Sequence, residues 1–195
     1  MQPRIPRPTV HEPVPPTVDD VAGFSAELVA AVAGARRRAV RSADRQIDSA
    51  HLLHSLLESD AEVRGMFGEE PRISRVLGYL VQRSIGYGLR WQGGVEDSGE
   101  VPVVAVAEGF SPVAAVAVEG ARVRAVRRGV ALAEGVDLLA AVLADPRSRA
   151  VEVLGRAGVD AGELLERVEK GEGGDVGEAG WEGRGGGPRT REPRT

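Results

Sequence analysis

The chain has 195 residues, of which 42% are hydrophobic and only 4% aromatic, and its formal net charge is −4. This length is enough for one ordinary domain or two small ones with a core of Ala, Val and Leu, and the acidic balance argues against a surface devoted to nucleic acid. Because there is no cysteine, the sequence excludes a disulfide scaffold, thiolate metal sites and cysteine catalysis, and it suits a cytoplasmic protein.

The N-terminal segment, residues 1–23, contains six prolines in a polar setting. Proline at this density favours extended polyproline geometry over helix, so we predict a disordered arm. The segment has no apolar stretch of the kind that directs secretion, and no window of the chain approaches 18 uninterrupted apolar residues. We therefore expect a soluble, intracellular protein without a membrane span.

Four helices are predicted in residues 24–86. In the first, small and apolar residues recur every three or four positions from Phe24 to Ala39, the spacing of one helix face, and Ser25 is placed to cap its start. The second helix runs from Ala50 to Glu58 and is capped by Asp48 or Ser49, the third follows Ser59-Asp60 and runs to Phe67, and the fourth begins at Glu70-Pro71 and is ended by Gly86 and Gly88.

Residues 87–109 are rich in glycine and acidic residues and are predicted to form a linker, with Trp91 as an anchor onto the core and 101–107 as an extended segment. Four more helices are predicted in 110–170. They open at Ser111-Pro112, at Glu134-Gly135, at Asp145-Pro146 and at Asp160, which has Glu163 at capping-box spacing. The nine glycines of residues 171–195 predict a disordered tail.

The two helical sets repeat each other at an offset of 86 residues. Phe24-Ser25 corresponds to Phe110-Ser111, and Arg38-Ala39-Val40-Arg41 corresponds to Arg124-Ala125-Val126-Arg127. The same offset, without a gap, places His51-Leu52-Leu53 on Asp137-Leu138-Leu139. A fixed period of this length indicates a tandem duplication of one four-helix unit.

This repeat resembles the Clp repeat, the N-terminal domain of Clp ATPases of the ClpA and ClpC type. The match is carried by Phe24-Ser25, by residues 47–56 (IDSAHLLHSL), by Phe110-Ser111-Pro112 and by residues 154–159 (LGRAGV), and it covers about 24–170. The resemblance implies an all-α domain of two tandem four-helix repeats related by a pseudo-twofold axis, with disordered tails at both ends. The AAA+ modules that follow this domain in the family are missing from the sequence, so we expect a free-standing Clp-repeat protein.

The function implied by the resemblance is recognition of protein substrates, adaptors or small cyclic peptides, in contact with a Clp ATPase or apart from it. In the family's cyclic-peptide groove, between the first helices of the two repeats, the matching residues are Val32, Phe110 and Glu119. Some members bind phosphoarginine through a glutamate at the positions of Ala50 and Val136, which here are neutral and cannot offer a charged partner to a guanidinium. Ser49 remains as a candidate contact of such a ligand.

Two other features allow a functional and a structural interpretation. His51 and His54 have a spacing that can hold a metal, but without visible further ligands except Asp48 we interpret His51 as a packing and capping residue. The arginines at 36–45 form a basic cluster that is either a solvated helix end or an anion and nucleic-acid site; no interleaved aromatic residues accompany it for stacking on bases.

We find no motif of a nucleophile with its base or of paired acids, and no Walker A loop, so the sequence predicts no enzyme, no cofactor and no metal site. The function that fits best is a non-catalytic binding module, an accessory, adaptor-like or decoy protein of Clp-type proteolysis. The alternatives are an anion or nucleic-acid-binding regulator that uses the arginine cluster, and a dimerising module without a ligand.

Overall fold

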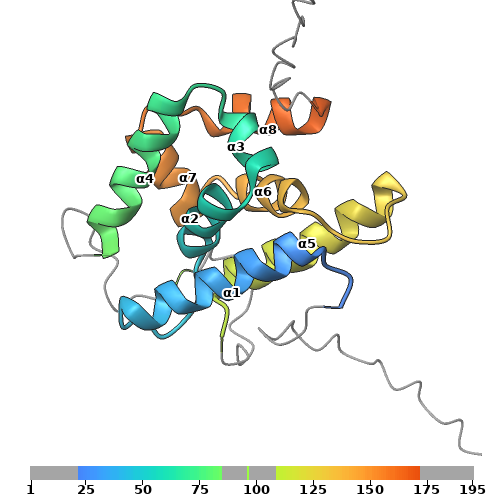
Figure 1. The fold of residues 1–195 in the computed structure, drawn as a ribbon, viewed down its shortest axis with the longest axis horizontal. Helices are drawn as coiled ribbons and strands as arrows, with labels where there is room; N and C mark the ends of the chain where they lie inside the picture. The colour runs from blue at the N-terminus through green and yellow to red at the C-terminus, as the bar shows by residue number, and fades with distance from the viewer. Residues whose placement is uncertain (1–21, 85–95, 97–108, 172–195) are drawn as a thin grey trace, which may run out of the picture.

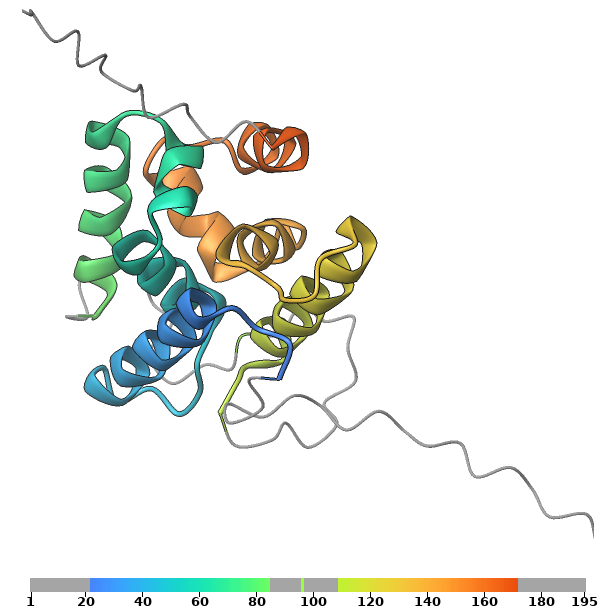
Figure 2. The same ribbon diagram turned by 45° about the vertical axis from the view of Figure 1, so that its right-hand side comes forward.

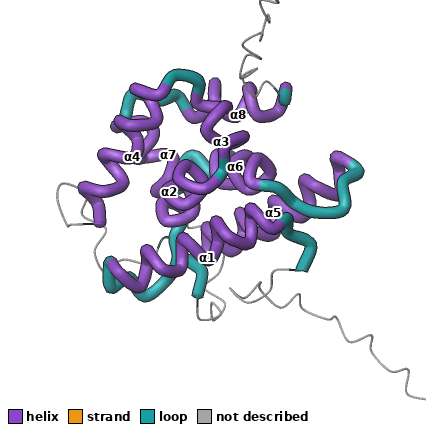
Figure 3. The backbone as a smooth tube through the Cα atoms, viewed as in Figure 1, coloured by secondary structure: helices purple, strands orange, loops and turns teal. Residues whose placement is uncertain are grey.

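Eight α-helices form in the computed structural model, which describes residues 22–84, 96 and 109–171, and this part of the chain holds no strand longer than an isolated bridge (Figure 3). The helices are α1 (Ala26–Arg41), α2 (Ser49–Ser59), α3 (Ala61–Phe67), α4 (Glu70–Ser84), α5 (Pro112–Arg128), α6 (Gly135–Leu143), α7 (Arg149–Arg156) and α8 (Ala161–Lys170) (Figure 1). The predicted all-α fold is confirmed.

The helices begin where capping side chains stand in the sequence. The hydroxyl of Ser25 accepts a hydrogen bond from the backbone N–H of Leu28 (3.2 Å), and the hydroxyl of Ser111 accepts the equivalent bond from Ala114 (3.1 Å). Asp160 caps α8 in the predicted way. Each of these bonds satisfies a backbone donor that has no partner inside its helix, so the helix starts follow from local chemistry.

One helix start differs from the prediction. Helix α7 begins at Arg149 and is capped by Ser148, whose hydroxyl accepts from Val151 N at 3.2 Å, so the predicted start at Asp145-Pro146 is wrong. The side chain of Asp145 instead accepts from the backbone N–H of Arg147 at 2.9 Å, a turn that competes with helix formation.

The structure decides between the two predicted caps of α2, and the cap is Asp48 rather than Ser49. The predicted helix end at Gly86 and Gly88, the Trp91 anchor, the extended segment 101–107, and nearly all of the predicted arm and tail lie outside the described residues.

The centre of the fold is formed by α2 and α6, with α1 and α5 along one side (Figure 1). Every residue from Ser49 to Leu57 in α2 is buried, and α6 is nearly as enclosed, as expected of helices that are surrounded by protein on all faces. Buried residues of both repeats belong to one continuous hydrophobic core. The two repeats are therefore halves of one folding unit rather than two separate cores.

Small residues bring the first helix of each repeat close to the second helix of the same repeat. A Cβ atom added at Gly34 in α1 would lie 2.1 Å from the hydroxyl of Ser55 in α2, and one added at Gly120 in α5 would lie 3.1 Å from the Cβ of Ala141 in α6. These glycine positions correspond under the 86-residue offset. The stripe of small residues thus serves packing within each repeat.

The repeats exchange backbone hydrogen bonds reciprocally. Phe24 forms an isolated parallel bridge with Ala133, and Phe110 forms one with Ile47. The bonds run from Ser25 N to Ala133 O (2.9 Å), from Ala133 N to Gly23 O (2.7 Å), from Ser111 N to Ile47 O (2.8 Å) and from Ile47 N to Gly109 O (2.6 Å). Since Ile47 and Ala133 are equivalent positions, the two bridges are copies of each other, as the pseudo-twofold arrangement requires.

Truncation of either member of an equivalent buried pair tests whether the repeats unfold together. Leu53 in α2 and Leu139 in α6 correspond in the two repeats, and both are fully buried. We expect Leu53→Ala and Leu139→Ala each to lower the free energy of unfolding by about 2–5 kcal/mol because each leaves a cavity, with a single transition in urea. The controls are Val40→Ala and Val126→Ala at exposed equivalent positions. Two separate transitions in either leucine variant would contradict the shared core.

Candidate functional site

A groove of about 950 Å³ on the described surface is bounded by α3, α5, α6 and α8. Its walls and floor are largely apolar and are formed by Met66, Val116, Val123, Val136, Ala140, Leu165 and Val168. Charged side chains stand around it, namely Glu62, Glu119, Arg124, Arg127, Arg128, Glu169 and Lys170. An apolar floor with a polar rim is typical of a site that binds peptides or small molecules.

The apolar wall on α5 is open to solvent. Val116 is 57% exposed and Val123 is 42% exposed, and their spacing of seven residues places them on the same side of the helix. Gly120, which lies between them, also lines the groove and packs closely on Ala141 of α6.

One side of the groove is held by a buried acid, Asp137, at the start of α6. Its carboxylate accepts a hydrogen bond from Arg128 Nη1 at 2.8 Å and lies 3.3 Å from Arg124 Nε, and it also accepts from the backbone N–H of Glu134 at 3.0 Å. The hydrogen bond with Asp137 raises the pKa of Arg128 above its usual value. A fully buried carboxylate is stable only with such partners, so Asp137 fixes the positions of both arginines.

A second acid of the groove, Glu62 on α3, lies where a negative charge is disfavoured. Partial burial of its carboxylate and the nearby charges of Glu134 and Asp60 raise the pKa of Glu62 above its ordinary value of 4.5. Of the acids on the rim, Glu62 thus stands where α3 faces the start of α6, while the arginines stand on α5.

The structure separates the four residues that were predicted to contact ligand. Val32 and Phe110 are buried in the core, and Ser49 is buried at the start of α2. Glu119 on α5 lines the groove and pairs with Arg122 at 3.2 Å. Of the four, only Glu119 lies on the groove.

The backbone N–H and the hydroxyl of Ser49 both donate to an acid that the sequence pattern does not reveal, Glu96. The carboxylate of Glu96 accepts hydrogen bonds from the backbone N–H of Ser49 (2.8 Å), from the Ser49 hydroxyl, from the Ser111 hydroxyl (2.8 Å) and from the backbone N–H of Arg149 (2.8 Å). It therefore joins the N-termini of α2 and α7, where a negative charge is stabilised by the helix dipoles. A ligand that reached Ser49 would have to displace it.

The equivalent place in the other half is filled differently. There Gly135 stands in the position of Ser49, and the carboxylate of Asp60, the cap of α3, fills the space that a side chain at Gly135 would need. The equivalent helix near Ser49 is α7, and its cap is Ser148, which carries no charge. Glu96, from the segment between the repeats, thus supplies at Ser49 the carboxylate that Asp60 supplies at Gly135.

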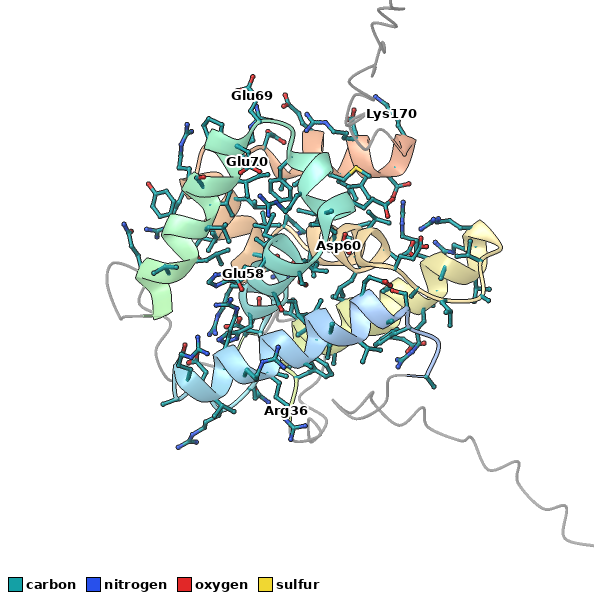
Figure 4. The ribbon with its side chains drawn as sticks, viewed as in Figure 1. Arg36, Glu58, Asp60, Glu69, Glu70 and Lys170 are labelled. Carbon is teal, nitrogen blue, oxygen red and sulfur yellow. The ribbon has the colours of Figure 1, made fainter. Side chains whose placement is uncertain are left out.

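The histidine candidate has a structural role, and the arginines of the predicted cluster lie mostly on the surface. His51 forms a capping box with Asp48, and its Nε2 lies 3.1 Å from a carboxylate oxygen of Asp44, which confirms the packing and capping interpretation. In the described residues no three His, Cys, Asp or Glu side chains gather as metal ligands do. Arg36 lies on the outer side of α1, away from the other helices (Figure 4), and Arg38 pairs with Glu58.

The other arginines of the predicted cluster, Arg37, Arg41 and Arg45, are exposed. In the view of Figure 2, α1 (blue) lies at the lower left and α5 (yellow) at the lower right, and both helices are inclined in the same direction.

Comparison with known proteins identifies the fold. No protein-family model and no curated protein matches the sequence. Among solved structures, the N-terminal domain of the caseinolytic protease-associated chaperone ClpD from Arabidopsis thaliana is similar with 16% identity and a TM-score of 0.53, covering 76% of this chain and 93% of that one.

Two further solved structures are similar at comparable level. The Hsp104 N-terminal domain from Candida albicans has 12% identity and a TM-score of 0.57, covering 74% of this chain and 88% of that one. A protein from a malarial secretion system has 11% identity and a TM-score of 0.54, covering 77% and 96%. The predicted resemblance is thus confirmed for the fold, which is that of Clp and Hsp104 N-terminal domains. None of the described helices is long and apolar enough to cross a membrane.

Removal of the Glu96 charge tests the connection between the helix N-termini. We expect Glu96→Gln to lower the free energy of unfolding by about 1–3 kcal/mol, because an amide cannot accept from all four buried donors and leaves some unsatisfied. Chemical denaturation measures this change. The control is Glu152→Gln, which removes an exposed acid of α7; equal stability of the two variants would contradict the role of Glu96.

The raised pKa of Glu62 predicts a pH-dependent effect. A carboxyl whose pKa is higher in the folded than in the unfolded state loses folded stability as the pH rises through that pKa. We therefore expect Glu62→Gln to melt at a higher temperature than the wild type at pH 7, and the difference to vanish below about pH 4, where the carboxyl is protonated in both states. Melting curves across pH 3–8 measure it, with Glu166→Gln as an exposed control on α8. A difference that persisted at low pH would contradict this cause.

Proposed function

We propose that the protein is a non-catalytic binding module that captures peptide-like ligands in the groove between α3, α5, α6 and α8, as an accessory, adaptor-like or decoy component of Clp-type proteolysis in the cytoplasm. The observation that carries the proposal is the groove itself, an apolar trough with a charged rim on a fold shared with the N-terminal domains of ClpD and Hsp104.

The chemistry of the groove favours an extended or cyclic peptide. Exposed valines on α5, Val116 and Val123, offer apolar contact, and burial of such side chains is the main source of affinity in peptide binding. On the rim, Glu119 accepts from donors of the ligand, and Arg127, which is exposed, binds its carbonyls or acids. Apolar contact would therefore give affinity, and the rim would give orientation.

Ligand binding through the other three predicted residues is a separate hypothesis. Val32, Ser49 and Phe110 are buried, and Ser49 donates to Glu96, so a cyclic peptide that reached them would have to rearrange the surface between α1 and α5. For phosphoarginine, neutral Ala50 and Val136 stand where the family has an acid. The proposal therefore ranks peptides above phosphoarginine as ligands.

The proposal is tested by titration with a cyclic peptide that binds Clp repeats and, in parallel, with phosphoarginine. We expect the cyclic peptide to bind, and Val123→Asp to weaken this binding at least about tenfold, since a charge in an apolar contact costs more than about 1.4 kcal/mol. Calorimetry measures the affinity. The matched control is Val126→Asp on the same helix, which is exposed and does not line the groove.

Three outcomes would decide against the proposal. If folded protein bound neither ligand, nor any Clp subunit or substrate in a pull-down from native lysate, the assignment would fail. If binding fell steeply with salt and depended on Arg36 and Arg37, the alternative of an anion or nucleic-acid-binding regulator would be favoured. If sizing showed a stable dimer without a ligand, the dimerising module would be favoured.

A further inference from the structure

The C-terminal segment of the chain begins at the rim of the groove. Lys170 and Gly171, the last two residues that the structure describes, both line it (Figure 4 labels Lys170 at the end of α8). Gly171 ends α8 with a φ of 68°, a left-handed conformation that glycine adopts without strain and that turns the chain away from the helix axis. Residues 172–195 therefore start beside the groove.

The chemistry of this segment complements the groove. Its first part, residues 172–183 (EGGDVGEAGWEG), contains four acids, no basic residue, and Trp181, one of only two tryptophans in the chain. The rim of the groove carries three acids, Glu62, Glu119 and Glu169, as well as four cations. One of them, Arg127, is exposed and has no ion-pair partner within the described part of the chain, and Lys170 has only an exposed contact of 3.8 Å with Glu166. An acidic segment with one large apolar side chain fits an apolar floor beside Arg127, which has no such partner, and Lys170, whose partner is distant.

The distance along the chain is short enough for this contact. Ten residues separate Gly171 from Trp181, and a chain of this length spans up to about 35 Å when extended. The glycines at 173, 174, 177 and 180 remove the steric restriction on sharp turns between these points. A short tether also gives an effective concentration in the millimolar range.

We propose that residues 172–183 bind in the groove of their own chain, with Trp181 against Val116 and Val123 and with the acids near Arg127 and Lys170. The segment then competes with peptide ligands, so that a ligand is captured only when it displaces the tail. The competition rests on the proposed function of the groove, whereas the contact itself does not.

The contact is tested in the full-length chain, in a Trp91→Phe background in which Trp181 is the remaining tryptophan. We expect Trp181 to emit at shorter wavelength and to be quenched less by acrylamide than the tryptophan of a free 172–183 peptide. Val116→Asp combined with Val123→Asp should return both signals to the values of the peptide, whereas the control Val126→Asp should leave them unchanged. Arg127→Glu should shift them in the same direction as the groove variant.

Two results would overturn the contact. If the emission wavelength and quenching of Trp181 in the Trp91→Phe protein equalled those of the free peptide and did not change in the groove variants, the tail would not occupy the groove. Signals that changed with protein concentration would show that the tail binds a second copy instead. A circular-dichroism melt of each variant separates loss of contact from loss of folding.

The competition is tested by a second measurement with the cyclic peptide. We expect Trp181→Ala to lower its Kd about tenfold, as follows if the tail covers the groove about nine-tenths of the time. An unchanged Kd would overturn the competition. If the cyclic peptide bound neither the wild type nor Trp181→Ala, this would count against the proposed function. The fluorescence of Trp181 would still decide whether the tail is bound.

Discussion

The fold depends on a reciprocal exchange at the point where each repeat begins. The segment before α1 bonds to the chain just before α6, at Ala133, and the segment before α5 bonds to the chain just before α2, at Ile47. Each repeat thus completes the backbone hydrogen bonds of the other, in a place where unpaired groups would be costly. Together with the shared core, this exchange makes one cooperative unit of two copies.

The two copies have then diverged at their equivalent positions. The start of α2 carries His51 where the start of α6 carries Asp137, and both side chains close a capping box. Only Asp137 adds a buried charge, and this charge holds Arg124 and Arg128 beside the groove. The ions beside the groove therefore differ between the copies, since His51 stands in the position of Asp137 and Ser42 in the position of Arg128.

The capture role proposed above fits this division of the molecule. One half of the surface is closed by Glu96, which uses the donors of two helix N-termini and of Ser111. The other presents valines to solvent beside a rim of both acids and cations, and the rest of the chain after α8 starts there. A fold that keeps its buried charges satisfied can leave apolar side chains exposed at one place, and such exposure is typical of a binding surface.

How much the sequence determined can be seen at particular residues. The helices, their caps at Ser25, Ser111 and Asp160, and the tandem arrangement follow from periodicity and from local hydrogen bonding, which act over a few neighbouring residues, and the fold class followed from the resemblance. The start of α7 could not be predicted from local sequence, because Asp145-Pro146 and Ser148 are competing signals for a helix start. The groove and the place of Glu96 were decided only by the tertiary structure. They depend on which helix faces come together and which buried donors need an acceptor, and an acid in a glycine-rich linker carries no pattern that identifies it in advance.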